Sequence, residues 1–283
     1  MHIFFAIALF LVSFSQSLQG LGLSYHLSSQ KSLIGNKPPV LLLHGLISSK
    51  ETWEPVLKGL QDELGEVWSL DLPGYGDSYK IPYKTLIEVK DALRQFVQEH
   101  KIISPIIIAH SMGAQLSVLC YDILKPSVLI IEDMDMQQRK RPAKGGLQSF
   151  ESGFATRSEL LKGLAKAGYY KPNVDMIDTQ YVVKEKGRFF AKINPYVDFH
   201  YRENVSSNAE VKSAWKSLPT DLPILVLLAD KGSATSEQGI RFMKESHTKI
   251  EVKKIPESVH SIHRSRPNEF FAEIKSFLVN IKK

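Results

Sequence analysis

Short apolar runs alternate along the chain with longer segments in which apolar residues recur every three or four positions. Most of the short runs are almost entirely apolar, as expected of strands covered on both faces. They are residues 40–43, 67–70, 106–109, 128–131, 224–228 and 250–254. The longer segments have helical spacing and are residues 52–64, 86–96, 111–124 and 270–281. This alternation predicts an α/β fold with a mostly parallel central sheet and helices on both of its faces.

One long segment interrupts the alternation. Residues 134–221 contain no clear strand, and a structureless loop of that length is improbable in a compact domain. We therefore expect a helical cap insertion, with helices near 158–164 and 211–218, between the two parts of the core at 21–133 and 222–283. Aromatic residues are dense toward the end of this insertion, at Tyr181, Phe189, Phe190, Tyr196, Phe199 and Tyr201.

The first twenty residues differ from the rest of the chain. Residues 3–14 form an apolar run with a single serine, too short for the roughly 20 residues that span a bilayer. Ser15 and Ser17 follow with the spacing of small residues that signal peptidases recognise. We expect residues 1–20 to be a cleaved signal peptide. The mature protein is then exported, to the periplasm or the medium, with no stable membrane anchor.

Composition narrows the classes of function. A hydrophobic content of 43% and a charged content of 23% are ordinary for a globular protein. The net charge of +6 is dispersed apart from the basic run 139–141, which argues against a nucleic-acid partner. Cys120, the single cysteine, lies in an apolar stretch and is expected to be a small buried residue. Metal, phosphate-loop and dinucleotide motifs are missing from the sequence, so we expect no metal and no cofactor.

The motif that carries chemistry surrounds Ser111. The strand predicted at 106–109 leads almost directly into this serine, and a helix begins at once. Such a tight turn requires small residues two positions before and after the serine, and these are Ala109 and Gly113. The turn lifts the hydroxyl above the sheet at a helix N-terminus, where the helix dipole favours developing negative charge.

This pattern resembles the nucleophile elbow of the α/β-hydrolase family, G-x-S-x-G, with Ala109 in place of the first glycine. Two further motifs strengthen the resemblance: L-L-H-G-L at 42–46 and D-L-P-G-Y-G-D-S at 71–78. The resemblance implies that Ser111 is a nucleophile and that the backbone amides of Leu46 and Met112 form an oxyanion hole. The 71–78 loop is interpreted as structural.

A histidine after the last strand completes the order that the resemblance implies. His260 stands at the family's base position, although Val259 replaces the usual glycine, and His263 is the alternative. A histidine titrates near neutral pH, so it is suited to taking the serine proton and returning it to a leaving group.

The acid that orients this base is assigned less directly. Asp133, just after the strand at 128–131, matches the site used by dehalogenase-like branches of the family, and Glu132 or Asp135 replaces it if the strand ends elsewhere. Asp230, in the loop after the strand at 224–228, is close to the commoner family site. We favour Asp133 and keep Asp230 as the alternative acid.

The predicted function is hydrolysis of a small-molecule carboxylic ester, or a related acyl bond, through an acyl-enzyme on Ser111. A capped carbon–carbon bond hydrolase and a non-catalytic binding protein on the same fold are the alternatives. A serine at the elbow, rather than an aspartate, argues against haloalkane dehalogenase and epoxide hydrolase chemistry. The sequence leaves the oligomeric state open.

Overall fold

The computed structural model describes residues 22–28, 37–81, 83, 85–137, 149–166, 182–192, 201 and 209–281. Several predicted features lie outside these residues. They are the signal peptide at 1–20, the basic run 139–141, and the aromatic residues Tyr181, Tyr196 and Phe199.

A seven-stranded sheet forms the centre of the molecule, in the order β1-β3-β2-β4-β5-β8-β9. Its strands are β1 (Tyr25–Ser28), β2 (Val40–Leu43), β3 (Val67–Leu70), β4 (Ile106–His110), β5 (Val128–Glu132), β8 (Ile224–Ala229) and β9 (Ile250–Ile255). All neighbours pair in parallel except β1, which runs antiparallel to β3 at the edge. The structure confirms the mostly parallel sheet and the six predicted strands; β1 was not predicted.

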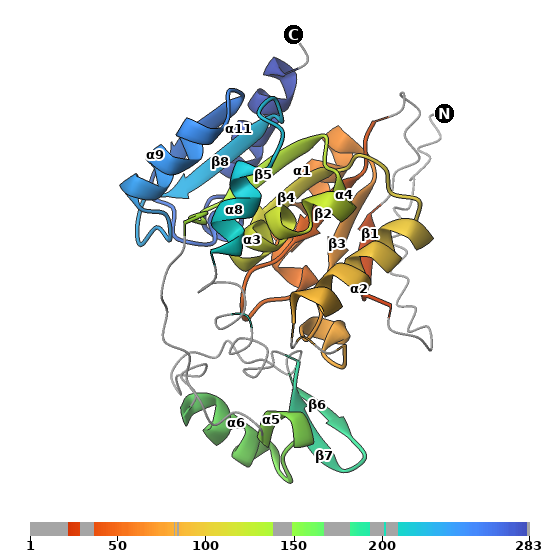
Figure 1. The fold of residues 1–283 in the computed structure, drawn as a ribbon. Coiled ribbons are helices and arrows are strands. Elements are labelled where there is room, and N and C mark those ends of the chain that lie inside the picture. Colours follow the sequence, from red (N-terminus) through yellow and green to blue (C-terminus); the bar gives the residue numbers. More distant parts are fainter. Residues whose placement is uncertain are drawn as a thin grey trace, which may run out of the picture.

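Alternate strand residues supply two hydrophobic cores, one on each face of the sheet. Leu41 and Leu43 belong to one core, whereas Val40 and Leu42 belong to the other. The first core is covered by α2 (Leu86–Glu99), α3 (Met112–Leu119), α4 (Tyr121–Leu124), α8 (Glu210–Lys216) and α9 (Glu237–Ser246). The second is covered by α1 (Glu54–Leu64), α10 (Ile262–Ser265) and α11 (Pro267–Asn280). Figure 1 shows this layered arrangement.

The helix predicted at 111–124 is divided at Cys120 into α3 and α4. Cys120 is fully buried, and burial raises the pKa of its thiol to about 12. The thiol is therefore protonated at neutral pH and packs as a small apolar group, as predicted.

The segment between β5 and β8 contains α5 (Ser149–Ser152), α6 (Arg157–Lys166), the antiparallel hairpin of β6 (Val182–Glu185) and β7 (Arg188–Ala191), and α8. The predicted helices near 158–164 and 211–218 are present as α6 and α8, whereas the hairpin was not predicted. The helices α5 and α6 and the hairpin share a small hydrophobic core of Phe150, Leu160, Leu164 and Ala191, and they lie together at one end of the molecule (Figure 1). Helix α8 packs instead against α3 of the main core.

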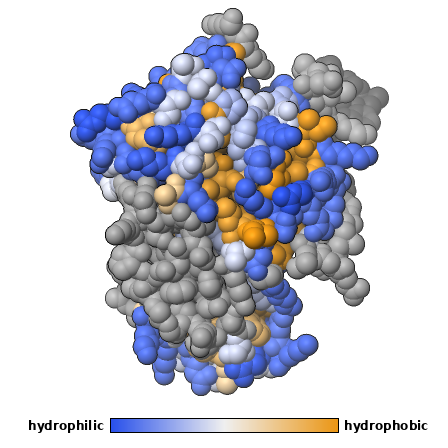
Figure 2. All heavy atoms as spheres, viewed as in Figure 1, coloured by the Kyte–Doolittle hydropathy of each residue, from blue (hydrophilic) through white to orange (hydrophobic). Residues whose placement is uncertain are grey.

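Hydrophilic residues cover most of the described surface on the face seen in Figure 2, and hydrophobic residues gather in a band near its centre. Within the described ranges, no helix combines the length and the apolar character that crossing a membrane requires. The exposed large apolar side chains include Ile47 and Val259. These two residues directly adjoin Leu46 and His260 in the sequence, so apolar surface lies beside the predicted site.

Candidate active site

The residues predicted to carry the chemistry lie at the carboxyl ends of the parallel strands. Ser111 directly follows β4, Asp133 directly follows β5, and His260 lies in the loop after β9. Strands β4 and β5 are neighbours in the sheet. The carboxyl edge of a parallel sheet is the usual position of ligand sites in open α/β folds.

Ser111 occupies a sharp turn between β4 and α3. Its φ is 51° and its ψ is −116°, a conformation rare for residues other than glycine. Its backbone N–H donates to the Glu132 carbonyl at 3.0 Å, which ties the turn to β5. A Cβ on Gly113 would lie 2.4 Å from the Leu43 carbonyl oxygen, so only glycine lets α3 start this close to β2. The residue Ala109, in place of the family's first glycine, is accommodated within β4.

The loop after β2 packs directly against this turn. A Cβ on Gly45 would lie 2.7 Å from Nδ1 of His110, which explains the glycine of the His-Gly pair. The His44 ring donates from Nδ1 to the Gly45 carbonyl at 2.8 Å and accepts the Leu72 N–H at Nε2 at 3.0 Å. Burial lowers the pKa of His44, so the ring stays neutral and serves both partners.

The two predicted oxyanion donors are close to the serine in the chain or in the fold. Met112 is buried and is the first residue of α3, and Leu46 follows Gly45 in the loop that packs on Ser111. That the backbone amides of Leu46 and Met112 form an oxyanion hole remains a prediction.

The structure joins Ser111, His260 and Asp133 by hydrogen bonds. The Ser111 Oγ lies 3.0 Å from His260 Nε2, and His260 Nδ1 lies 2.7 Å from Asp133 Oδ2. Asp133 is fully buried, Ser111 is 9% exposed, and the His260 side chain is 38% exposed. A hydroxyl, an imidazole and a carboxylate in this order are able to activate the hydroxyl as a nucleophile.

Asp133 is held by several donors besides His260. Its carboxylate accepts the backbone N–H of Ala229 at 3.2 Å, that of Ala234 at 2.9 Å, and the Ser233 hydroxyl. Burial raises the pKa of Asp133, but the hydrogen bonds from His260, Ser233 and the two amides outweigh it and lower the pKa overall. The carboxylate is therefore ionised and fixed in orientation.

Asp230, the alternative acid, lies elsewhere. Its carboxylate pairs with Lys254 at 2.7 Å and accepts the Glu257 N–H at 3.1 Å. Within the described part of the chain, Asp230 makes no hydrogen bond with His260. It anchors the loop that leads to His260 and does not face the imidazole.

His263 and Asp135 are also engaged with partners of their own. His263 is fully buried, and its ring contacts Glu132 and Thr52 instead of Ser111. Asp135 accepts from the Ser236 hydroxyl at 2.8 Å, near the start of α9. Of the candidate acids and bases, Asp133 and His260 are the pair that the structure brings to the serine.

A buried lysine beside the site was not predicted. Lys50, 2% exposed, contacts the carboxylates of Asp71 at 2.6 Å, Asp77 at 2.7 Å and Glu51 at 3.0 Å. Burial lowers its pKa, but these three charges raise the pKa well above its usual range. The D-x-P-G loop supplies two of these carboxylates. Its aspartates are the sequence signal from which a buried cation beside the loop could have been predicted.

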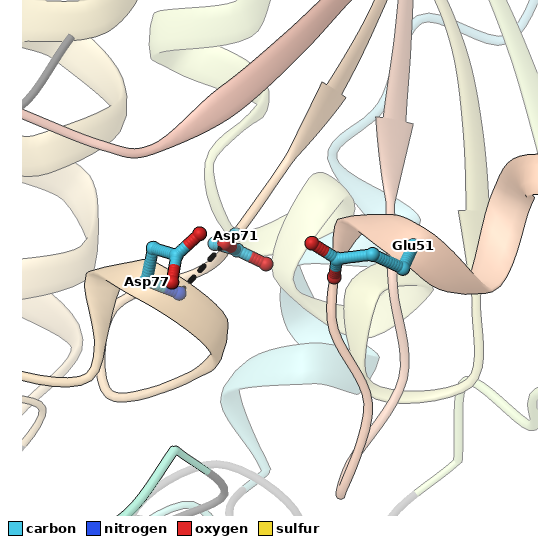
Figure 3. A group of neighbouring side chains, drawn as sticks. All are labelled: Glu51, Asp71 and Asp77. Carbon is cyan, nitrogen blue, oxygen red and sulfur yellow. Dashed lines mark hydrogen bonds between the residues drawn. The ribbon is translucent and has the colours of Figure 1, made fainter. Parts of the chain in front are cut away.

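The same three carboxylates are close enough together to hold a metal ion (Figure 3). Because the Lys50 ammonium already contacts each of them, the cluster has its own cation. Asp71 also accepts the Lys50 and Asp77 backbone N–H groups, both at 2.8 Å. The arrangement is typical of a structural support for the loop, in agreement with the interpretation of residues 71–78.

This loop also contacts the β6–β7 hairpin. Lys192, just after β7, pairs with Asp77, and Glu185, the last residue of β6, accepts from the Tyr79 hydroxyl and pairs with Lys80 at 2.7 Å. Asp77, at the end of this loop, and Tyr79 and Lys80 just after it thus hold the hairpin at the edge of the sheet where the site lies.

Positive φ angles at residues other than glycine recur around the site. Of the eight such residues in the described part of the chain, four lie in segments that form the site and four lie elsewhere. The four near the site are Ile47, Ser111, Asp133 and Glu257, with φ between 48° and 57°. The conformation is most unusual for Ile47, because its β-branched side chain is crowded there. Backbone strain of this kind is typical of functional sites that the surrounding fold holds in place.

Comparisons with known proteins agree with the fold. The chain is 24% identical over 261 residues to an abhydrolase domain-containing protein of Schizosaccharomyces pombe, covering 87% of this chain and 94% of that protein. It is 22% identical over 276 residues to the mouse sn-1-specific diacylglycerol lipase ABHD11, covering 92% and 86%. Among solved structures, a marine microorganism esterase superposes with a TM-score of 0.67 at 20% identity, covering 91% of this chain and all of that one. Residues 40–274 match the Alpha/beta hydrolase family, and the chain is a member of that family.

Proposed function

We propose that this protein is a serine hydrolase that cleaves a carboxylic ester through an acyl-enzyme on Ser111. The observation that carries the proposal is the hydrogen-bonded order Ser111, His260, Asp133 at a strained turn on the carboxyl edge of the sheet. The family includes relatives named as a diacylglycerol lipase and as a putative esterase/lipase of Mycoplasma genitalium, which supports an ester as the substrate.

The proposed reaction follows from the hydrogen bonds. His260 Nε2 takes the Ser111 proton while Oγ forms a bond to the ester carbonyl carbon. The oxyanion accepts from the backbone amides of Met112 and Leu46, and Asp133 stabilises the imidazolium. His260 then protonates the leaving alcohol as the carbon–oxygen bond breaks. In the second half, His260 takes a proton from water as the water oxygen bonds to the acyl carbon. The bond from that carbon to Ser111 Oγ then breaks, His260 returns the proton to Oγ, and the acid leaves.

We also propose that part of the insertion at 134–221 forms a cap over this site. Its helices α5 and α6 and the β6–β7 hairpin have a hydrophobic core of their own, and residues 77–80 hold the hairpin at the carboxyl edge of the sheet. A cap of this kind would enclose an apolar acyl or alcohol group and limit the chain length accepted. Hydrolysis rates for p-nitrophenyl esters of graded acyl length test this, since an uncapped site would show little length preference.

Export is proposed on the sequence of residues 1–20 alone. N-terminal sequencing of the protein after expression in its own cell type tests it. A mature chain that begins near residue 20 is expected, and an uncleaved Met1 contradicts it.

Hydrolysis of a p-nitrophenyl ester by wild type and by Ser111→Ala tests the proposed function. Ser117→Ala is the matched control, because Ser117 is also buried and its hydroxyl donates to the Ala114 carbonyl of its own helix. We expect hydrolysis by wild type and the control, and a rate near the uncatalysed baseline for Ser111→Ala. Equal rates for all three proteins would contradict the proposal and favour a non-catalytic binding protein.

A further inference from the structure

A second chain of hydrogen bonds lies beside the proposed catalytic one. The Glu132 carboxylate contacts Nδ1 of His263 at 2.8 Å, and Nε2 of that ring contacts the Thr52 hydroxyl at 2.8 Å. Glu132 and His263 are both fully buried. Glu132 directly precedes Asp133, and His263 follows His260 by three residues, so both chains are built on the same two segments.

Glu132 holds the main chain as well as the ring. One of its oxygens accepts the backbone N–H of His263 at 3.0 Å. A single carboxylate at the end of β5 thus fixes the start of α10, two residues after His260. Since Asp133 is the next residue of the same strand end, the distance between acid and base depends on this connection.

Aromatic packing restricts the His263 ring further. Its centroid lies 4.3 Å from that of Trp53 and 5.3 Å from that of His110. Nε2 of His110 donates to the His260 carbonyl at 3.1 Å, and the two rings lie 4.7 Å apart. The main chain at His260 and at His263 is therefore anchored to the ends of β4 and β5.

His260 needs such support because its own surroundings are open. Its side chain is 38% exposed, and Val259 beside it is 47% exposed. A buried carboxylate–imidazole pair is a poor source of stability, because desolvation offsets much of the attraction between the partners. It does impose a specific geometry, because each partner must be met at a fixed distance and angle.

We propose that Glu132 and His263 are positioning residues, which hold the main chain of His260 so that its Nε2 stays in hydrogen-bond distance of Ser111 Oγ. This inference rests on the proposed function, in which His260 is the base. A displacement of about 1 Å in such a group costs on the order of 100-fold in rate. Both residues are fully buried, so we expect the loss to fall on kcat and to leave KM close to that of wild type.

The experiment compares Glu132→Ala, Glu132→Gln and His263→Gln with wild type, by kcat and KM for a p-nitrophenyl ester and by thermal unfolding. Glutamine keeps an oxygen that accepts the His263 N–H, whereas alanine removes it. We expect kcat to fall on the order of 100-fold in Glu132→Ala and on the order of 10-fold in Glu132→Gln, with KM within about twofold.

His247→Gln is the matched control. His247 is also a buried imidazole packed on a buried tryptophan, 4.6 Å from Trp215, and it contacts the Trp215 carbonyl at 3.1 Å, away from the proposed site. We expect it to lower the unfolding temperature as His263→Gln does while kcat stays at the wild-type value. Wild-type kcat in folded Glu132→Ala, or an equal loss of kcat in His247→Gln, would overturn the inference.

Two readouts separate this inference from the proposed function. Comparison with Ser111→Ala tests the proposed function. If wild type hydrolyses the ester no faster than Ser111→Ala does, the proposed function is wrong. Nuclear magnetic resonance signals of the His260 ring report its tautomer and hydrogen bonds without turnover. We expect these signals to change in Glu132→Ala and not in His247→Gln, and unchanged signals in both variants would overturn the inference whether or not the protein is active.

Discussion

Two chains of hydroxyl, imidazole and carboxylate lie side by side at the carboxyl edge of the sheet. Ser111, His260 and Asp133 form one, and Thr52, His263 and Glu132 form the other. The distances within them are similar, from 2.7 to 3.0 Å in the first and 2.8 Å in the second. The chemical order of the three groups therefore does not distinguish them.

Burial and backbone conformation do distinguish the two chains. His263 is fully buried under Trp53, whereas the His260 side chain is 38% exposed. Thr52 lies within the short 3-10 helix η1 (Lys50–Trp53), whereas Ser111 lies at a strained turn that begins the eight-residue helix α3. The imidazole of the first chain is open to solvent, and its hydroxyl lies at a helix N-terminus, where developing negative charge is favoured. Exposure of the imidazole and backbone strain at the hydroxyl, more than the order of the three groups, therefore distinguish the first chain from the second.

The largest effect is expected from breaking the first chain at its carboxylate. Asp133→Asn leaves the imidazole without its ionised partner and disfavours the required tautomer, so kcat should fall about 10,000-fold. Asp230→Asn is the control, because asparagine keeps an oxygen that can accept the Glu257 N–H and loses only the charge pair with Lys254 at the surface. We expect its kcat within about twofold of wild type. Steady-state kinetics of both variants test this, and the reverse ranking would exchange the roles of the two aspartates.

His110, which lies between the two chains, should control stability in acid. Burial is the main cause that lowers its pKa to about 4, whereas an unfolded histidine has a pKa of about 6.5. The unfolded state therefore binds the proton first as pH falls. His110 therefore contributes about 3 kcal/mol to the free energy of unfolding above pH 6.5, and this contribution is lost as the pH falls toward 4.

Urea unfolding of wild type and His110→Gln between pH 4 and pH 7 measures this contribution. The free energy of unfolding should depend less steeply on pH in the variant. Parallel curves for the two proteins would show that His110 is not the group responsible.

Gly113 allows the tight turn at Ser111, in the first chain. A Cβ there would lie 2.4 Å from the Leu43 carbonyl and 2.6 Å from that of His44, so Gly113→Ala must move the start of α3. We expect kcat to fall on the order of 100-fold, because Ser111 moves with the helix. Gly59→Ala, whose Cβ would meet the Phe271 ring at an ordinary 3.5 Å, should keep wild-type kcat and gain up to about 1 kcal/mol of stability. Similar kcat values for both variants would contradict this steric explanation.

The smallest effect is expected at the far end of the second chain. Thr52→Val keeps the shape of the side chain but removes the hydroxyl that meets His263 Nε2. The free energy of unfolding should fall by about 1–2 kcal/mol, with kcat within about twofold of wild type. Calorimetry and ester kinetics test this, and a loss of kcat comparable to that of Asp133→Asn would place Thr52 in the chemistry.

Much of the fold follows from the sequence because buried parallel strands are apolar on both faces. Strand β1 was missed because all four of its residues are half-buried at an antiparallel edge, so it lacks the continuous apolar run of the inner strands. The hairpin was missed although it has a recognisable turn. Lys186 and Gly187 both have positive φ, as in the two-residue turns that join hairpin strands. The helical interpretation of the insertion overlooked this Lys-Gly signal.

The residues of the site that belong to recognisable motifs could be predicted from the sequence. The serine and the base follow from the elbow and the last loop, but the choice between Asp133 and Asp230 depends on where each side chain points after its strand ends. That direction follows from packing, here from the donors at Ala229, Ser233 and Ala234. Glu132 was considered only as a substitute acid, because its contact with His263 joins residues 131 positions apart.

The role of Ser111 as nucleophile is tested most directly by locating the acyl group during turnover. A p-nitrophenyl ester is mixed with the protein, the reaction is quenched in acid within a few turnovers, and the digested peptides are examined by mass spectrometry. We predict the acyl mass on the peptide that contains Ser111, and no acylation in Ser111→Ala. Acylation at Thr52, or hydrolysis by Ser111→Ala at the wild-type rate, would contradict the proposed mechanism.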